Sequence, residues 1–258
     1  MQHYLVDKSS RLKGQGIVIN IQEFHGRLTA RGSTDGHVMK RQFELLGLDT
    51  TLAYGDVTKT SLLEEMEKGK RSIKQTDSLF AMCFMSHGEK GSIITSDLEK
   101  IKLQYILDEF NSSNCPALKN KPRLCMFQLC QDEPNAKEDM DEDEQDNEEM
   151  HNACWDYTID LRADFLLVFA TPAGFKAWRH CDGSYFVDAF KEALEEHKGE
   201  EIDMKKLFTT VGSRVAEKNI EVKRRDAGKE KPEDSTKFVK QMPCIVSSLT
   251  KDLILRLQ

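Results

Sequence analysis

A histidine and a cysteine follow two apolar runs that are typical of buried strands. Residues 79–85 form the run LFAMCFM, which is followed closely by His87 and Gly88. Residues 123–129 form a second apolar run, and Cys130 comes next. If the two strands are neighbours in a parallel sheet, both side chains emerge at the edge where such sheets bind ligands. An imidazole can activate a thiol and later protonate a leaving amine, so the pair predicts nucleophilic catalysis.

The pair by itself has a plain structural alternative. A cysteine that ends a buried strand commonly acts as a small apolar side chain, and a His-Gly pair after a strand is commonly a turn. The surrounding segments therefore have to decide between catalysis and packing.

Strand-like and helix-like segments alternate along the chain. Short apolar runs predict strands at residues 16–21, 49–54, 78–85, 123–129, 165–170 and 242–246, the last of these being the final strand. Apolar residues at helical spacing predict helices after Thr34, around 62–66, over 98–110, and from Ser184 and Asp203. Residues 219–237 are expected to form a polar loop. This alternation predicts an α/β fold with a mostly parallel sheet covered by helices on both faces.

The net charge of −7 is concentrated in one segment. Residues 132–149 contain eleven Asp or Glu and one Lys, so the remainder of the chain is slightly basic. A segment so charged cannot bury enough apolar surface to become ordered, and we interpret residues 132–158 as an exposed linker. We expect a short N-terminal segment (1–14), a larger unit (15–131) and a smaller unit (159–258), the two units together forming one domain.

Composition excludes several classes of protein. Seven cysteines at irregular spacing, with no CxxC pair, argue against a disulfide framework and a structural zinc site. The first residues lack an apolar signal segment, and the longest apolar runs are too short for a bilayer. Lys and Arg are scattered, so neither nucleic acid nor membrane is an expected partner. We expect a cytoplasmic protein with free thiols and no cofactor.

Several ordered segments resemble the caspase family. The segment Gln128-Leu-Cys-Gln-Asp132 is similar to the caspase signature Gln-Ala-Cys-[Arg/Gln/Gly]-Gly, whose histidine lies about 50 residues upstream. Further segments with caspase resemblance are Arg31-Gly-Ser-Thr-Asp35, Met85-Ser-His-Gly-Glu-Lys-Gly91, Ala170-Thr-Pro-Ala-Gly174, Trp178-Arg179, Gly183-Ser-Tyr-Phe186 and Lys240-Gln-Met-Pro-Cys-Ile-Val-Ser247. The resemblance spans roughly residues 14 to 255 and implies a caspase-like, six-stranded α/β fold in a short-prodomain, effector-like form.

The resemblance implies a cysteine endopeptidase that cleaves after aspartate, in apoptosis or a related proteolytic cascade. Cys130 would be the nucleophile and His87 the general acid/base, while the N–H groups of Gly88 and Cys130 would form the oxyanion hole. The residues that would bind substrate are Arg31, Gln128 and Arg179 around the aspartate, and Trp178 and Tyr185 in the next pockets. Two guanidiniums suit a carboxylate because each offers paired N–H donors.

The resemblance also implies partners and processing. The expected partners are protein substrates with an accessible Asp, and a second caspase chain in a homodimer or heterodimer formed through residues 242–246. Cleavage of the acidic linker would occur at an aspartate, and the candidates are Asp139, Asp141, Asp143 and Asp146. An unprocessed, solvated charge run is the alternative interpretation of this segment.

Four residues depart from the family pattern around the expected cleft. Leu129 replaces an alanine, Asp132 a glycine, Lys176 an aromatic residue and Ala177 a serine. Extra bulk at residue 129 typically costs about 1–3 kcal/mol unless neighbours shrink. A carboxylate at residue 132 would raise the pKa of a nearby thiol. These changes keep open an alternative function, that of a catalytically weakened homologue that regulates an active caspase by heterodimerisation.

Overall fold

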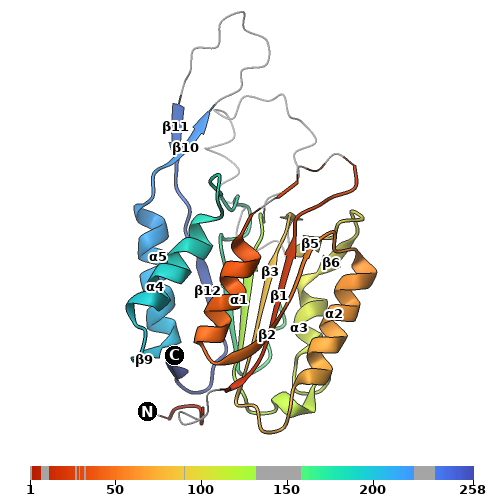
Figure 1. Cartoon of the computed structure of the whole chain (residues 1–258), viewed down its shortest axis with the longest axis vertical. Coiled ribbons are helices and arrows are strands. Elements are labelled where there is room, and N and C mark those ends of the chain that lie inside the picture. The colour runs from red at the N-terminus through yellow and green to blue at the C-terminus, as the bar shows by residue number, and fades with distance from the viewer. Residues whose placement is uncertain are drawn as a thin grey trace, which may run out of the picture.

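A six-stranded sheet forms the centre of the molecule (Figure 1). The computed structural model describes residues 2–6, 12–26, 28, 30–31, 33–89, 91–131, 158–223 and 236–258. The strands, in sheet order, are β12 (Cys244–Ser247), β8 (Phe165–Phe169), β7 (Arg123–Gln128), β3 (Leu79–Met85), β1 (Gly14–Ile21) and β2 (Leu48–Gly55). Five strands run parallel, and β12 pairs antiparallel with β8 at the edge. The predicted mostly parallel α/β fold is confirmed.

Helices cover both faces of this sheet (Figure 1). On one face lie α1 (Asp35–Leu45), α4 (Tyr185–Glu196) and α5 (Met204–Glu217), and on the other lie α2 (Lys59–Ser72) and α3 (Leu103–Glu109). Successive strand residues point to opposite faces, so Cys83 and Met85 pack under the first group while Met82 and Phe84 pack under the second. Because both faces are covered, the strands are continuous apolar runs rather than alternating ones.

Helix starts follow the sequence signals only in part. The Asp203 carboxylate accepts from the backbone N–H of Lys205 at 2.8 Å and so caps α5 as predicted. Thr58 likewise caps α2, but Thr34 and Ser184 precede α1 and α4 without a side-chain capping bond. No helix in the described ranges is long and apolar enough to cross a membrane.

The predicted helix over residues 98–110 is wrong in its first half. A three-stranded antiparallel sheet of β4 (Gly88–Glu89), β5 (Ser92–Ile94) and β6 (Lys100–Lys102) precedes α3. Leu98 has a φ of 62°, a left-handed conformation that an α-helix cannot contain. The apolar residues at positions 98 and 101 therefore belong to a turn and a strand rather than to a helical face.

The C-terminal segment holds more strands than the sequence predicted. The expected polar loop over 219–237 contains the hairpin strands β10 (Ile220–Lys223) and β11 (Thr236–Val239). β12 is not the final strand, because β13 (Ile254–Arg256) follows it and pairs with β9 (Glu201–Asp203). A short 3-10 helix (Pro116–Leu118) precedes β7.

The segments on either side of the acidic stretch share one sheet. β7 ends shortly before residues 132–157, which lie outside the described residues, and β8 begins after them. The two strands pair in parallel, with Phe127 opposite Phe169. Each face of the sheet has its own apolar cluster, and both clusters contain side chains from before and after the acidic stretch.

A buried arginine lies at the start of β7. Arg123, the first residue of β7, is 1% exposed and donates from Nε to the Phe110 carbonyl at 2.7 Å and from Nη2 to the Leu118 carbonyl at 2.8 Å. Its guanidinium also lies 4.8 Å from the centre of the Phe165 ring. Burial lowers the pKa of Arg123, yet each of its donors is used by a carbonyl of the loops before β7 and β8.

We predict that Arg123→Met lowers the free energy of unfolding by about 2–4 kcal/mol, because it leaves buried carbonyls without donors. Urea denaturation would measure the change. The matched control is Arg162→Met, since Arg162 is 64% exposed and pairs only with Asp160; its cost should stay below about 1 kcal/mol. Equal destabilisation by the two substitutions would contradict the prediction.

Candidate active site

His87 and Cys130 follow the ends of two adjacent strands. The register of β3 against β7 pairs Met85 with Gln128 at the ends of the two strands, and His87 and Cys130 each come two residues later along the chain. The ring of Phe24 lies edge-on to His87, with 4.7 Å between the ring centres. The two strands are adjacent and parallel, as the sequence predicted, and the catalytic pairing of His87 with Cys130 stays a prediction.

Gly88 lies against the backbone of the cysteine segment. A Cβ atom at this position would stand 2.8 Å from the Cys130 carbonyl oxygen and 2.9 Å from the Leu129 side chain. Since backbone atoms cannot give way cheaply, only glycine allows this approach. The tight packing holds the loop after β3 against the loop after β7, which brings their N–H groups to the same edge.

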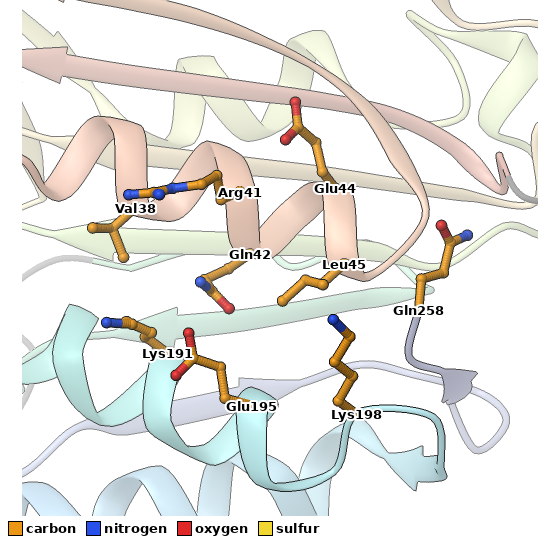
Figure 2. A pocket seen from close by; sticks show the side chains of 9 residues that line it. All are labelled: Val38, Arg41, Gln42, Glu44, Leu45, Lys191, Glu195, Lys198 and Gln258. Atoms are coloured by element: carbon orange, nitrogen blue, oxygen red, sulfur yellow. The ribbon is translucent and has the colours of Figure 1, made fainter.

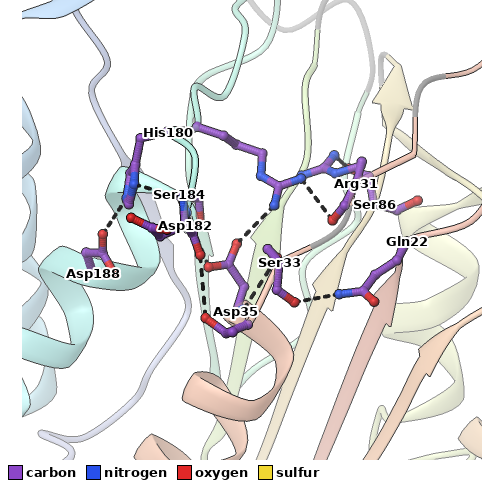
Figure 3. Close-up of polar contacts among 11 residues, drawn as sticks. Gln22, Arg31, Ser33, Asp35, Ser86, His180, Asp182, Ser184 and Asp188 are labelled. Carbon is purple, nitrogen blue, oxygen red and sulfur yellow. Dashed lines mark hydrogen bonds and ion pairs between the residues drawn. The ribbon is translucent and has the colours of Figure 1, made fainter.

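Arg31 is buried between these loops and the start of α1. Its backbone N–H donates to the Gln22 carbonyl at 2.7 Å, and its Nη1 donates to the Ser86 carbonyl (Figure 3). Burial and the nearby charge of Arg179 lower the pKa of Arg31 to about 10, while Cys130 and Asp35 act weakly in the opposite sense. The side chain is thus a buried cation with little compensating negative charge.

Arg179 reaches the same place from the loop before α4. Its Nη1 donates to the Arg31 carbonyl at 3.2 Å, and its Nη2 lies 3.8 Å from Asp35 Oδ2. Asp35, 3% exposed, also accepts from the Ser184 N–H at 3.2 Å, as Figure 3 shows. One carboxylate therefore serves two guanidiniums, and the Nε of Arg179 is buried without a hydrogen-bond partner.

Gln128 adds an unpaired amide to this cluster. The side chain is fully buried, and neither its Oε1 nor its Nε2 has a hydrogen-bond partner. Its backbone carbonyl accepts from the Ser86 N–H at 3.4 Å, so Gln128 and Arg31 both contact Ser86. Buried polar groups are rarely left unpaired in proteins, and a cluster of them is typical of a binding site.

Trp178 and Tyr185 frame the Arg179 loop. The backbone N–H of Trp178 donates to Gln241 Oε1 at 2.7 Å, and the Gln241 amide in turn donates to the Ala170 carbonyl at 2.8 Å. Tyr185 begins α4, and its ring packs against His180 with 5.1 Å between centres. Both aromatic side chains are half-buried beside the arginine cluster.

The departures from the family pattern fall in different environments. Leu129 is 1% exposed and packs with the apolar side chains under α2 and α3, whereas Cys130 packs on the opposite face of the sheet. Lys176 is exposed, and Ala177 is buried with its carbonyl 3.8 Å from the Cys130 Sγ. Asp132 and the four candidate processing aspartates lie outside the described residues.

Sequence reasoning missed the residues that support the site. Asp35 appeared in the sequence as the last residue of a segment with caspase resemblance, but its carboxylate accepts from the Ser184 N–H and lies near Arg179. Gln131 and Gln241 are buried and tie the loops around the cleft by amide-to-carbonyl bonds of 2.6 and 2.8 Å. In the sequence, Gln131 and Gln241 are simply polar residues beside a strand or a motif, and nothing there indicates their hydrogen bonds.

A separate cavity lies away from this cleft. It has a volume of about 500 Å³ and opens between α1 and α4, where Gln42 faces Lys191 and Glu195 (Figure 2). None of the predicted catalytic or substrate-binding residues lines it. This cavity is therefore distinct from the site that the sequence indicated.

The fold and the paired Cys and His side chains are those of a cysteine peptidase built on an α/β sheet. Residues 13–254 match the family model for the caspase domain, which is most of the 258-residue chain. The chain belongs to the caspase-domain family. The crystal structure of caspase-1 from Spodoptera frugiperda superimposes with a TM-score of 0.75 at 24% identity, covering 98% of this chain and 94% of that one.

Curated relatives agree with this assignment. The chain is 27% identical to caspase-6 of Gallus gallus over 93% of this chain and 80% of that protein. It is 28% identical to caspase-3 of Bos taurus (93% and 83% covered) and 28% identical to caspase drICE of Drosophila melanogaster (93% and 69%). Family membership supports a cysteine-peptidase type of activity with protein substrates.

We predict that Arg31→Gln raises the free energy of unfolding by about 1–3 kcal/mol. Since the folded-state pKa of Arg31 is depressed to about 10, charging it costs stability at every pH below that value, and the cost fades as the pH rises toward 12.5. At neutral pH a neutral amide removes the cost. Denaturation at pH 7 would measure the change, and a loss of stability would show that Arg31 is adequately paired.

Proposed function

We propose that the chain is an endopeptidase that cleaves peptide bonds after aspartate. The observation that carries this proposal is the cluster of Arg31, Arg179 and Gln128, which is buried, short of one negative charge and left with unpaired polar atoms. An aspartate carboxylate supplies what the cluster lacks. It brings one negative charge and acceptors for N–H donors of Arg179 and Gln128, in a site too dry for water to compensate.

The same chemistry disfavours other side chains at the cleaved position. An asparagine would bring acceptors but no charge, so the two guanidiniums would stay uncompensated. A lysine would add a third cation. Discrimination arises because buried hydrogen bonds to charged groups are worth about 1.5–3 kcal/mol each.

For the reaction, we assign Cys130 as the nucleophile and His87 as the general acid/base. The thiol proton passes to the imidazole as sulfur attacks the backbone carbonyl carbon of the substrate aspartate. The N–H groups of Gly88 and Cys130 stabilise the oxyanion, and the imidazolium gives its proton to the leaving amine. Water then hydrolyses the thioester, with His87 accepting and returning a proton.

The thiol contact with Ala177 is consistent with a resting form. A Cys130 sulfhydryl directed at the Ala177 carbonyl at 3.8 Å lies under the loop that carries Trp178 and Arg179. Substrate entry requires this loop to move off the sulfur. We propose that cleavage of the acidic linker at Asp139, Asp141, Asp143 or Asp146 favours that movement, which makes the intact chain a zymogen.

The same contact supports a second candidate function. If the loop stays over Cys130, the chain is a weakened homologue that acts in a heterodimer with an active caspase. In that case Lys176 and Ala177 matter more than Leu129, whose side chain packs away from the cysteine. The two functions differ in whether Cys130 is needed for turnover.

We predict that linker-cleaved protein hydrolyses fluorogenic peptides ending in Asp and that Cys130→Ala reduces kcat to background. Peptides ending in Asn should have a kcat/KM lower by about 100-fold or more, because the arginine pair loses its counter-charge. The matched control is Cys244→Ala, since Cys244 lies on β12, away from the cleft. Absence of turnover from folded, cleaved protein would reject the peptidase and leave the regulatory homologue.

We further propose that the chain dimerises through the β12 edge, in the cytoplasm. β12 pairs with β8 on one side only among the described strands, and Ile245 is 37% exposed along it. An edge strand with apolar side chains is a template for pairing with a second chain. Two copies of β12 that pair antiparallel would be related by a two-fold axis, so that both chains contribute the same strand to the interface.

We predict that Ile245→Lys shifts the protein from dimer to monomer, because a charge on an edge strand opposes pairing. Sedimentation velocity over a range of concentrations would measure the association. Lys251→Glu, a change outside β12, serves as the control and should leave it unchanged. A dimer of equal strength in Ile245→Lys would place the interface elsewhere.

A further inference from the structure

A second cluster of chemically active side chains lies one residue beyond Arg179. His180, Cys181 and Asp182 each offer one ligand atom, and these atoms lie within 4.8 Å of one another. Within the described residues, this is the single group of three His, Cys, Asp or Glu side chains close enough to hold a metal ion. Neither the proposed peptide cleavage nor the packing of the core uses it.

A tight turn brings these three consecutive residues together. Arg179 and Ser184 form an antiparallel bridge, and the His180 N–H donates to the Gly183 carbonyl at 2.8 Å. In an extended strand the side chains of residues 180, 181 and 182 would alternate in direction. The turn removes that alternation and gathers nitrogen, sulfur and oxygen donors on one side.

The histidine is held in one tautomer, and a metal at its Nδ1 would displace one long hydrogen bond from a backbone N–H. Its Nε2 lies 2.6 Å from Asp188 Oδ2, and its Nδ1 lies 3.3 Å from the backbone N–H of Asp182 (Figure 3). A backbone N–H can only donate, so Nδ1 accepts and Nε2 carries the proton that Asp188 receives. A carboxylate on the far nitrogen of a metal-binding histidine is the usual supporting arrangement, and the Tyr185 ring also packs on His180.

The Cys181 thiol proton lies between two of the candidate ligand atoms, the Cys181 sulfur and an Asp182 carboxylate oxygen. The Cys181 thiol donates to Asp182 Oδ2 at 3.2 Å. A metal ion would take the position of that shared proton, bound by the thiolate and the carboxylate together. Both side chains are exposed, so they can adjust from 3.2 Å to the roughly 3.3–3.8 Å ligand spacing of a tetrahedral site without disturbing the core.

We propose that His180, Cys181 and Asp182 bind a zinc ion, with Asp188 positioning His180 and a fourth coordination position open to water. The donor set decides the metal class, because calcium and magnesium prefer oxygen ligands alone, whereas zinc accepts imidazole, thiolate and carboxylate. Binding breaks the S–H bond and forms a Zn–S bond, and the thiol proton is released to solvent.

The site shares its turn with the arginine cluster. Ser184 ends the turn and donates to Asp35, which faces Arg179, and the Thr34 hydroxyl donates to the Asp182 carbonyl at 3.4 Å. Zinc therefore stiffens the segment that carries Arg179. The binding itself does not depend on the proposed peptidase function.

Metal titration of the full chain carrying Cys130→Ala tests the proposal, since this background removes the sulfur beside His87. Cobalt should give a thiolate-to-metal charge-transfer band at one equivalent with release of about one proton, and zinc should then displace the cobalt and remove the band without further proton release. Cys181→Ser should abolish the band and lower zinc affinity at least about tenfold. Cys244→Ser, the matched control, should change neither.

Asp188→Asn tests the positioning contact separately. It should weaken zinc affinity by about 10–100-fold while the band at saturation keeps its intensity, because the sulfur ligand is intact. Unchanged thermal melting of the metal-free variants confirms that they fold. A parent protein without the band, a band that survives Cys181→Ser, or an Asp188→Asn variant with parental affinity would overturn the assignment.

Discussion

A buried arginine and a partly buried one, with one carboxylate near them, are the constraint around which the cleft is organised. Arg31 and Arg179 come from segments 148 residues apart, and the carbonyl of the first accepts from the guanidinium of the second. The Asp35 carboxylate lies near the Arg179 guanidinium and accepts a hydrogen bond from the Ser184 N–H, just before α4. Like charges this close repel, so burying them costs stability unless an anion joins them. Asp35 supplies one negative charge beside two guanidiniums. The second negative charge would come from the substrate aspartate, and this is the basis of the proposed specificity.

The sheet makes this arrangement possible by ending several strands at one edge. β3 and β7 are parallel neighbours that end two residues before His87 and Cys130, and the absence of a side chain at Gly88 lets the two following loops touch. The helices on both faces keep these strands from shifting relative to each other. A small displacement along either strand would separate the two reactive side chains by a full residue spacing of about 3.3 Å.

The differences from the family pattern have unequal consequences. Leu129 is absorbed by the apolar layer under α2 and α3, so its bulk is directed away from the thiol. Ala177 instead presents its carbonyl to the cysteine sulfur. The loop from residue 174 to 182 thus links the nucleophile, the arginine pair and the His180 cluster. In the proposals above, peptide cleavage requires this loop to move, and a bound metal ion would restrict that movement.

The sequence by itself determined the sheet, most of its strands and the two reactive residues. Long apolar runs such as 79–85 leave no other stable environment than a sheet buried on both faces, and parallel strands must end at the same edge. Tertiary structure alone decided the roles of Asp35 and Ser86, because one polar residue looks the same in sequence whether it caps a helix or pairs with a distant arginine. It also decided that residues 98–102 turn and pair as a hairpin. Helical spacing over a few apolar residues does not exclude a strand when neighbouring chain segments supply the hydrogen bonds.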